Sequence, residues 1–569
     1  MKKNNILFKA SLVVVTLLIT LGTLFSQQSE SPLFKAMKDE IERSKNELIL
    51  PNSPAPYFIA YTVGETSYIT ITASKGVILT TKENPIERIN SVNLYVGDTN
   101  FSSDYSYSGN GMLASTLLNV DNDYNQIRRG FWQTSDVAYK FAVEVYKSKT
   151  NNIKNANLSD EEKALPDMLP LAKVEKRTTA PAKFNLDKEL YEGLAKRVSL
   201  ELSKHKSLYD TRVELDGITT NYYYLTTEGT QIIEPVSYVA LTYSGKVRND
   251  KGQVITDSEV IYSSEFDKLP SEQEINTMID KYAQRMLALQ ESQEIEEYYL
   301  GPVLFIEEAS ASLFANNLVS LSGVFAHRTP IQVMASVARV ESIASRRDVK
   351  PLEERIGKKV IDSRITIRNK TDINTFGSEK LIGSYTMDAQ GVVPEKESTL
   401  IENGILKKVL STRVPTKKSS YSTGSLRFGV RPRAIINEAA PGILEITTTG
   451  GSSVAGLKKE LIKAAMEEGL DYAYIVRKIS NNSTQYIYKV SVKDGTESLV
   501  TGVDLSPVAL AKLKRVLGVG NEQMVYNYLY QNSIPVSIIY PNGVLIEDIE
   551  INKKPLATLK NSPLITAGL

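Results

Sequence analysis

The second half of the sequence, from about residue 356 onward, consists of short β-rich runs, and this pattern limits the fold more than any other feature. Turn signals separate the runs at 389–391, 402–404, 449–451 and 540–543. Only two helices are expected to interrupt them, at 454–468 and 506–517. Such a density of strands predicts a barrel-like or layered β domain rather than a doubly wound parallel α/β sheet.

The first half of the chain mixes helical and β patterns. Apolar residues at helical spacing predict one helix that begins just after Ser31 and three more at 125–149, 186–204 and 271–290. The β-rich runs between 57 and 96 are broken at 64–65, 75–76 and 84–85, which predicts an antiparallel meander, and further strands are expected at 212–247 and 254–266.

Together these patterns predict an α+β protein of two domains. The N-terminal αβ domain is expected at 31–299 and contains a polar linker at about 150–176. The β-rich, barrel-like C-terminal domain is expected at 300–569, and it opens with a strand at 302–306 and a helix at 307–317.

The first 26 residues have the pattern of an export signal. Lysines at positions 2, 3 and 9 precede an uncharged apolar run at 10–25, and polar residues return at 27–30. The run is shorter than the ~20 residues of a typical membrane-spanning helix, which favours a signal cleaved after Ser26 over a retained anchor. We therefore expect a periplasmic or extracellular protein, attached to the membrane only if the signal stays uncleaved.

Charge and the scarcity of metal-binding residues exclude several functions. The chain has 67 Lys and Arg residues against 66 Asp and Glu, so it lacks the basic excess of a nucleic-acid-binding protein. It has no cysteine and only two histidines, His205 and His327. Disulfides, thiolate zinc sites and iron–sulfur clusters are therefore excluded, as is a three-histidine metal site within one chain.

Several short motifs follow one another in an order that is specific, although each motif alone is weak. They are Asp-Asn-Asp-Tyr at 121–124, Thr-Glu-Gly-Thr at 227–230, Tyr-Leu-Gly-Pro-Val-Leu-Phe at 299–305, Met-Asp-Ala-Gln-Gly-Val at 387–392, Leu-Ile-Glu-Asn-Gly-Ile-Leu-Lys at 400–407, Ser-Thr-Gly-Ser at 422–425 and Glu-Gly-Leu-Asp-Tyr at 468–472. In this order they resemble the TldD/PmbA (TldE) family, also called peptidase family U62 and modulators of DNA gyrase. The resemblance covers nearly the whole chain after the signal.

This resemblance implies dimers of two-domain subunits that enclose a cavity. The TldD type is a zinc peptidase that degrades unfolded or extended peptides, with the metal held by a helical His-Glu-x-x-x-His and a later Cys, and with the Glu as general base. In this sequence Glu308 matches the base position, but Glu307 and Ser312 stand where the two histidines should be. The resemblance is therefore closer to the metal-free PmbA/TldE type, and we expect no zinc and no other cofactor. As an alternative, Glu307 and Glu308 are simply an acidic first helical turn favoured by the helix dipole.

We expect a non-catalytic subunit that forms a heterodimer with a TldD-like zinc peptidase, or a homodimer, and helps to degrade unfolded peptides. Candidate peptide contacts are Ser422, Thr423, Gly424 and Ser425, because extended peptides bind by adding a strand to an exposed edge. An ordinary glycine turn is the alternative for this segment. Two other functions stay open: a self-associating envelope protein that binds peptides without a protease role, and a protease that uses carboxylate chemistry at Glu308.

Overall fold

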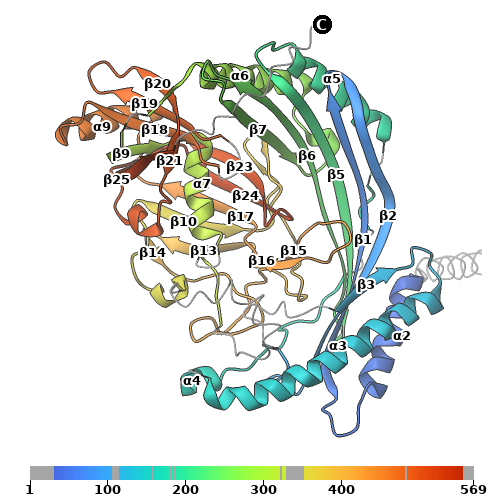
Figure 1. Cartoon of the computed structure of the whole chain (residues 1–569). Helices are drawn as coiled ribbons and strands as arrows, with labels where there is room; N and C mark the ends of the chain where they lie inside the picture. The colour runs from blue at the N-terminus through green and yellow to red at the C-terminus, as the bar shows by residue number, and fades with distance from the viewer. Residues whose placement is uncertain are drawn as a thin grey trace, which may run out of the picture.

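The protein is α+β, as predicted, and its two halves lie side by side (Figure 1). The computed structural model describes residues 31–104, 114–156, 158–177, 181–184, 187–295, 297–320, 323–328, 351–480 and 484–554. The export signal predicted at 1–26 lies outside these residues. None of the helices in the described ranges has the length and apolar character needed to span a membrane.

A long, mostly antiparallel sheet dominates the first half. Its pairing order is β3-β2-β1-β5-β6-β4, with β7 also paired to β6, and within the described ranges only β4 runs parallel to its neighbour. The strands are β1 (Pro56–Ser74), β2 (Val77–Val96), β3 (Ala114–Leu118), β4 (Lys176–Arg177), β5 (Tyr209–Thr226), β6 (Gln231–Arg248) and β7 (Val254–Ser263).

The meander predicted between 57 and 96 is one long hairpin, so two of its three expected breaks were wrong. Gly64 continues β1, because it pairs with Ile89 of β2 on one side and with Tyr222 of β5 on the other. Pro85 continues β2 inside a register shift between Thr66 and Tyr68 of β1, where a proline leaves no ladder hydrogen bond unmade. Only the turn at 75–76, with both residues at positive φ, ends a strand.

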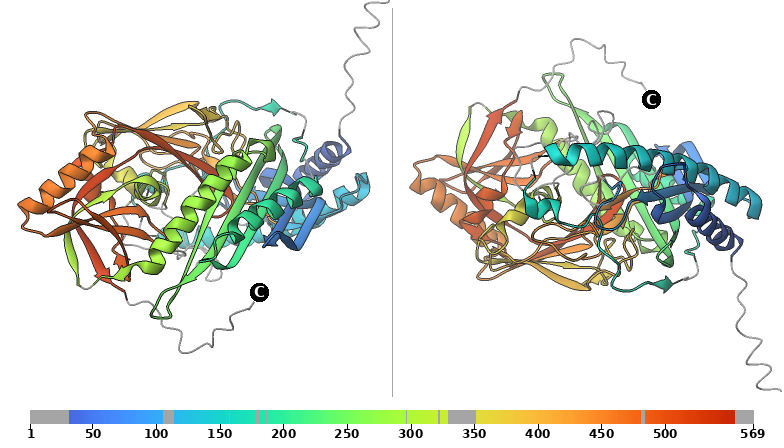
Figure 2. Two further views of the ribbon diagram at one scale, coloured as in Figure 1. Left: turned by 90° about the horizontal axis from the view of Figure 1, so that it is seen from above. Right: turned by 90° about the horizontal axis from the view of Figure 1, so that it is seen from below.

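Four helices cover one face of this sheet. They are α2 (Pro32–Glu47) and α3 (Tyr124–Asn152) at one end, and α5 (Lys188–Ser203) and α6 (Glu272–Glu291) at the other. Because side chains alternate along a strand, Tyr223 packs under α2 and α3, whereas Tyr222 and Tyr224 point to the opposite face and pack against Phe428 of the second half. The sheet therefore lies between the helices α2, α3 and α5 and the C-terminal half, whereas α6 also contacts β20 of that half, and Figure 2 shows the arrangement from above and below. The predicted linker contains a short helix, α4 (Asp160–Lys163).

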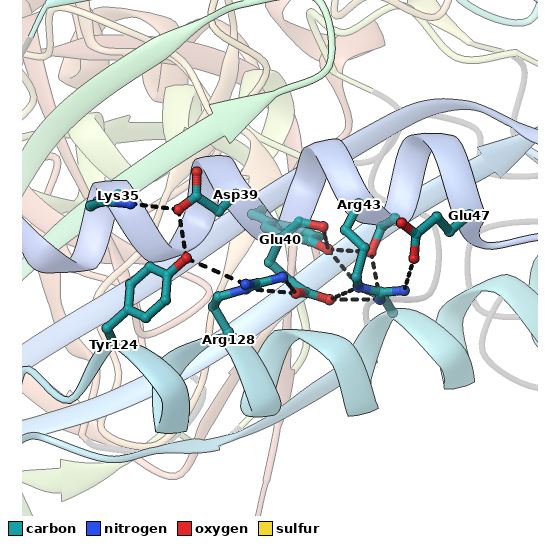
Figure 3. A network of polar contacts seen from close by, with 10 residues as sticks. Lys35, Asp39, Glu40, Arg43, Glu47, Tyr124 and Arg128 are labelled. Carbon is teal, nitrogen blue, oxygen red and sulfur yellow. Dashed lines mark hydrogen bonds and ion pairs between the residues drawn. The ribbon is translucent and has the colours of Figure 1, made fainter.

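A buried carboxylate joins α2 to α3 (Figure 3). The Glu40 side chain is 2% exposed, and its carboxylate forms ion pairs with the guanidinium groups of Arg43 at 2.6 Å and of Arg128 of α3 at 3.1 Å. Next to it, the Tyr124 hydroxyl donates to Asp39 at 2.6 Å, and Arg128 in turn donates to the Tyr124 hydroxyl at 3.3 Å. Two arginines thus compensate one buried charge between the helices.

The second half contains two large open sheets and two small two-stranded ones, so the barrel-like description was wrong, whereas the α+β class is confirmed. One sheet has the order β14-β13-β10-β17-β24-β23 and the other β21-β25-β9-β18-β19-β20-β8, with β22 also paired to β25, and in the described ranges neither closes on itself. Their strands are β8 (Gln293–Glu294), β9 (Tyr299–Phe305), β10 (Ile365–Lys370), β13 (Glu397–Glu402), β14 (Ile405–Leu406), β17 (Ile443–Thr448), β18 (Tyr472–Lys478), β19 (Tyr486–Ser491), β20 (Glu497–Thr501), β21 (Val503–Leu505), β22 (Gly518–Val519), β23 (Gln523–Tyr530), β24 (Ile534–Pro541) and β25 (Val544–Lys553).

Helix α7 (Glu307–Leu318) lies in the core between the two sheets. It contacts β18 of one sheet and β24 of the other, and its apolar residues belong to the largest buried cluster of the described chain. Helix α9 (Val454–Glu467) covers the outer face of the second sheet, so Val303 and Phe305 of β9 face α7 while Leu304 faces α9. A barrel is not formed because a helix, rather than side chains alone, fills the space between the sheets.

The helix predicted at 506–517 was wrong. Leu505 still pairs with β25, and the Ser506 amide donates to the carbonyl of Glu550, so the chain is held as an edge strand up to this point. Strand β22 then begins at Gly518, and only a short 3₁₀ turn (Leu510–Lys514) fits between the two strands. Tertiary pairing has overridden the local helical pattern.

Candidate functional site

Helix α7 starts abruptly after strand β9. Glu307 has a φ of 53°, a left-handed backbone conformation that costs a residue with a side chain roughly 1–2 kcal/mol. Its amide donates to Oδ1 of Asn542 at 2.9 Å, and the Ser310 hydroxyl donates to the carbonyl of Pro541 at 2.7 Å. The turn between β24 and β25 therefore fixes the first turn of the helix that carries the degenerate motif.

The Glu307 carboxylate is already bound by a cation. Its Oε1 lies 2.5 Å from Nη1 of Arg477, which also pairs with Glu497 at 3.1 Å, and Lys458 binds the other oxygen of Glu497 at 2.6 Å. These four side chains of alternating charge thus form a row from the start of α7 over strands β18 and β20 to α9. This arrangement gives Glu307 a structural role at the helix start.

Glu308 differs from its neighbour because it forms no hydrogen bond or ion pair with any described residue, although it is partly buried. Burial raises the pKa of its carboxyl to about 7, against an ordinary value of 4.5. The cation of Lys478 acts in the opposite direction, and the carboxylates of Glu259 and Asp257 raise the pKa further. A carboxyl with a pKa near neutrality can both give and take a proton.

The charges around Glu308 come from both halves of the chain. Asp257 of β7 is fully buried, and it is bound by Nζ of Lys478 at 3.0 Å and by the hydroxyl of Tyr486 at 2.6 Å. Beside this group, Arg285 of α6 pairs with Glu259 of β7. The polar cluster thus ties the N-terminal sheet and α6 to strands β18 and β19 of the C-terminal half.

The residues at the three motif positions do not fit a zinc ion. The Ser312 side chain is neutral and 8% exposed, while the Glu307 carboxylate is held by Arg477, whose charge opposes a second cation at the same oxygens. The sequence has no cysteine to supply a thiolate. In the described part of the chain, no group of three or more His, Cys, Asp or Glu side chains is arranged to hold a metal. The chemistry left at this site is therefore that of one protonatable carboxyl, Glu308.

The segment 422–425 is folded tightly into the C-terminal half. Thr423 and Ser425 are buried, with their hydroxyls 2.8 Å apart, and Thr423 also exchanges hydrogen bonds with Ser411. Gly424 has a φ of 70° and donates its amide to the Ser422 hydroxyl at 3.1 Å. Peptide binding here stays a prediction, and Ser422 is the residue of the four that is not buried.

Sequence reasoning missed the polar cluster that lies near Glu308. Asp257, Lys478 and Tyr486 are far apart in the chain, and none belongs to a motif. One available signal was Lys478, which ends the otherwise buried strand β18, and another was Asp257, which occupies a core position of β7. A motif that was recognised has a structural role: Glu228 of Thr-Glu-Gly-Thr accepts two hydrogen bonds of 2.7 Å from Arg413 and so links the two halves.

Comparison with known proteins supports the predicted family. Residues 302–553 match the family model described as PmbA/TldA metallopeptidase C-terminal domain. No curated protein sequence matches the chain.

Solved structures share the fold over most of the chain. TldE from Thermococcus kodakarensis has a TM-score of 0.56 at 14% identity, covering 91% of this chain and 100% of its own. A protein described as a modulator of DNA gyrase from Thermotoga maritima has a TM-score of 0.58 at 14% identity, covering 91% and 99% of the two chains. A second one, from Bacteroides thetaiotaomicron, has a TM-score of 0.57 at 14% identity, covering 93% and 99%. Residues 302–553 therefore form a C-terminal domain of the PmbA/TldD type, and the chain as a whole shares the fold of these solved structures.

Proposed function

We propose that this protein is an exported, non-catalytic TldE-like subunit that pairs with a zinc-bearing TldD-like peptidase and helps to enclose the unfolded peptides that the partner degrades. The observation that supports the proposal most strongly is the ion pair between Glu307 and Arg477, because it occupies a position where the catalytic type of the family needs a metal ligand. The proposed export rests on the sequence pattern at 1–26.

Co-expression with a TldD-like chain from the same organism tests this function. We expect the two chains to co-purify and to hydrolyse an unfolded peptide such as reduced, carboxymethylated casein, whereas this chain alone does not. Replacing the Glu of His-Glu-x-x-x-His in the partner by Gln is expected to abolish hydrolysis by the pair. Hydrolysis that persists with the inactivated partner contradicts the proposal.

A second function, proteolysis by carboxylate chemistry, is favoured by one observation. Glu308 has a pKa of about 7, which suits a general acid or base near neutral pH. Under this alternative, Glu308→Gln lowers the activity of the isolated chain at least ~100-fold, the low end for removing such a group. Glu307→Gln is the matched control, because it changes a neighbouring carboxylate with a different role. Under the main proposal neither variant alters the activity of the pair.

A further inference from the structure

A cavity of about 850 Å³ lies between the two halves, away from α7. Strands β5 and β6 supply one wall, including Thr219 and Tyr238, and the C-terminal half supplies the other, including Ile382, Tyr385 and Arg427. This volume lies within the range of about 300–1,000 Å³ that is typical of small-ligand sites.

Arg427 is the unusual residue of this cavity. It sits on β15 (Leu426–Phe428), is 3% exposed, and its guanidinium lies 4.4 Å from the ring centre of Tyr385. Nη1 donates to two carbonyl oxygens, of Pro441 at 2.7 Å and of Pro535 at 2.6 Å. Backbone carbonyls thus fix one edge of the guanidinium and hold it against the cavity wall.

The other edge of the guanidinium has no partner among the described residues. A guanidinium carries five N–H donors in a rigid fork, and the two on Nη1 are used, so those on Nε and Nη2 remain. Arg427 forms no ion pair with a described residue. The acid with the strongest electrostatic effect on it, Glu234, is already bound by Arg177 at 2.9 Å and by the amide of Thr386 at 3.0 Å.

An anion in the cavity would stabilise the buried charge of Arg427. Burial lowers the pKa of Arg427 to about 10, so the group is still charged at neutral pH. Removing a cation from water without a counter-charge is costly. The free Nε and Nη2 edge matches the two oxygens of a carboxylate in the bidentate geometry that arginine favours.

We propose that Arg427 anchors an organic carboxylate whose apolar body packs against the aromatic part of the cavity wall. That part is formed by Phe184, Tyr191, Tyr238, Phe266, Met387 and Phe428, while charged side chains, among them Glu234, Glu265, Asp267 and Lys268, also line the cavity. The ligand is either the C-terminal carboxylate of a peptide or a free small carboxylic acid. The peptide form deepens the proposed function and rests on it, whereas binding of a small acid does not.

Calorimetric titration of the purified protein tests the site on the ligand side. The probes are N-acetyl-Ala-Ala-Phe with a free carboxylate, the same peptide as its C-terminal amide, and 3-phenylpropanoate. We expect the free acid to bind about 10- to 100-fold more tightly than the amide, because a charge-assisted bidentate pair is lost. If 3-phenylpropanoate binds as tightly as the peptide acid, a small carboxylic acid is enough to fill the site. If it binds more weakly, the peptide is the ligand.

Two variants test the site on the protein side. Arg427→Lys keeps the charge but loses the fork, and it is expected to weaken binding of the acid at least 10-fold. Val236→Trp leaves Arg427 in place and fills the cavity that Val236 lines, so it is expected to abolish binding. Arg368→Lys is the control, since this arginine lies on β10 and pairs with Glu397 and Glu445.

Equal affinity for acid and amide, or no binding of the acid up to about 10 mM, overturns the carboxylate site. Because the titration uses this chain alone, such a result leaves co-purification with a TldD-like partner untouched. Conversely, acid binding without co-purification supports the site and contradicts only the proposed partnership.

Discussion

Replacing Lys478 by Met breaks the buried ion pair that joins the two halves near Glu308. The Lys478 side chain is 9% exposed and that of Asp257 is fully buried, so water screens their 3.0 Å contact very little. Lys478 also donates to the carbonyl of Ser258 at 2.9 Å. Removing one partner of a buried pair typically costs 3–5 kcal/mol, because the other charge is left uncompensated. Since the Tyr486 hydroxyl still donates to Asp257 and Met fills most of the lysine volume, we expect the lower end, about 3 kcal/mol.

Urea unfolding followed by far-ultraviolet circular dichroism measures this loss of free energy of unfolding. The matched control is Lys246→Met, which breaks an ion pair of 2.5 Å with Asp210 in which the side chains are 36% and 64% exposed, and it should cost less than about 1 kcal/mol. The double variant Lys478→Met with Asp257→Asn removes both charges and should recover at least about 1 kcal/mol. If Lys478→Met is as stable as Lys246→Met, Asp257 is not a buried charge that depends on Lys478.

Three further predictions concern stability. The first is that Glu308→Gln flattens the pH dependence of stability. The pKa of this carboxyl is about 7 in the folded chain against an ordinary value of 4.5, so folding retains a proton that the unfolded chain releases. Between about pH 4.5 and 7 the free energy of unfolding of the natural protein, measured by urea titration, should therefore fall by up to about 3 kcal/mol more than that of the variant. Glu40→Gln should cost about 1–3 kcal/mol in thermal unfolding, because two arginines lose their counter-charge. The control Asp136→Asn breaks an exposed ion pair and should cost under about 0.5 kcal/mol. Equal losses for the two variants argue against the buried network around Glu40. Gly424→Ala should cost about 2–3 kcal/mol of unfolding free energy, since the φ of Gly424 is 70° and the new Cβ would lie 2.9 Å from Pro394. The control Gly469→Ala has a φ of 73° but open space around the new Cβ, so it should cost only about 1 kcal/mol. Similar losses for the two variants in urea unfolding would exclude a clash at Pro394.

The sequence predicted the elements whose signals are local. The helix expected at 125–149 is α3 (Tyr124–Asn152), and the one expected at 271–290 is α6 (Glu272–Glu291), which starts from a complete capping box at Ser271. The run Tyr222–Tyr224 alternates between the two faces of β5, as expected of a strand. The breaks at Gly64 and Pro85 failed because neighbouring strands and a register shift accommodate them, which no local signal reveals.

The candidate site was predictable only in part. The motif order located Glu307, Glu308 and Ser312 on a helix, and the structure places them on α7. Their environment depends on β7, α6 and β18, which meet only in the folded chain. The high pKa of Glu308 and the ion pair of Glu307 with Arg477 therefore could not follow from sequence spacing. Arg427 was missed for the same reason, because its exposure to a cavity is a property of both halves together.

The zinc content of the purified chain tests the central proposal most directly. After equilibration with zinc and dialysis, inductively coupled plasma mass spectrometry gives the metal bound per chain, and the same sample is assayed against an unfolded peptide. We expect no stoichiometric zinc and no hydrolysis, because Arg477 holds Glu307, Ser312 is neutral and no cysteine is present. One tightly bound zinc per chain together with peptide hydrolysis contradicts it.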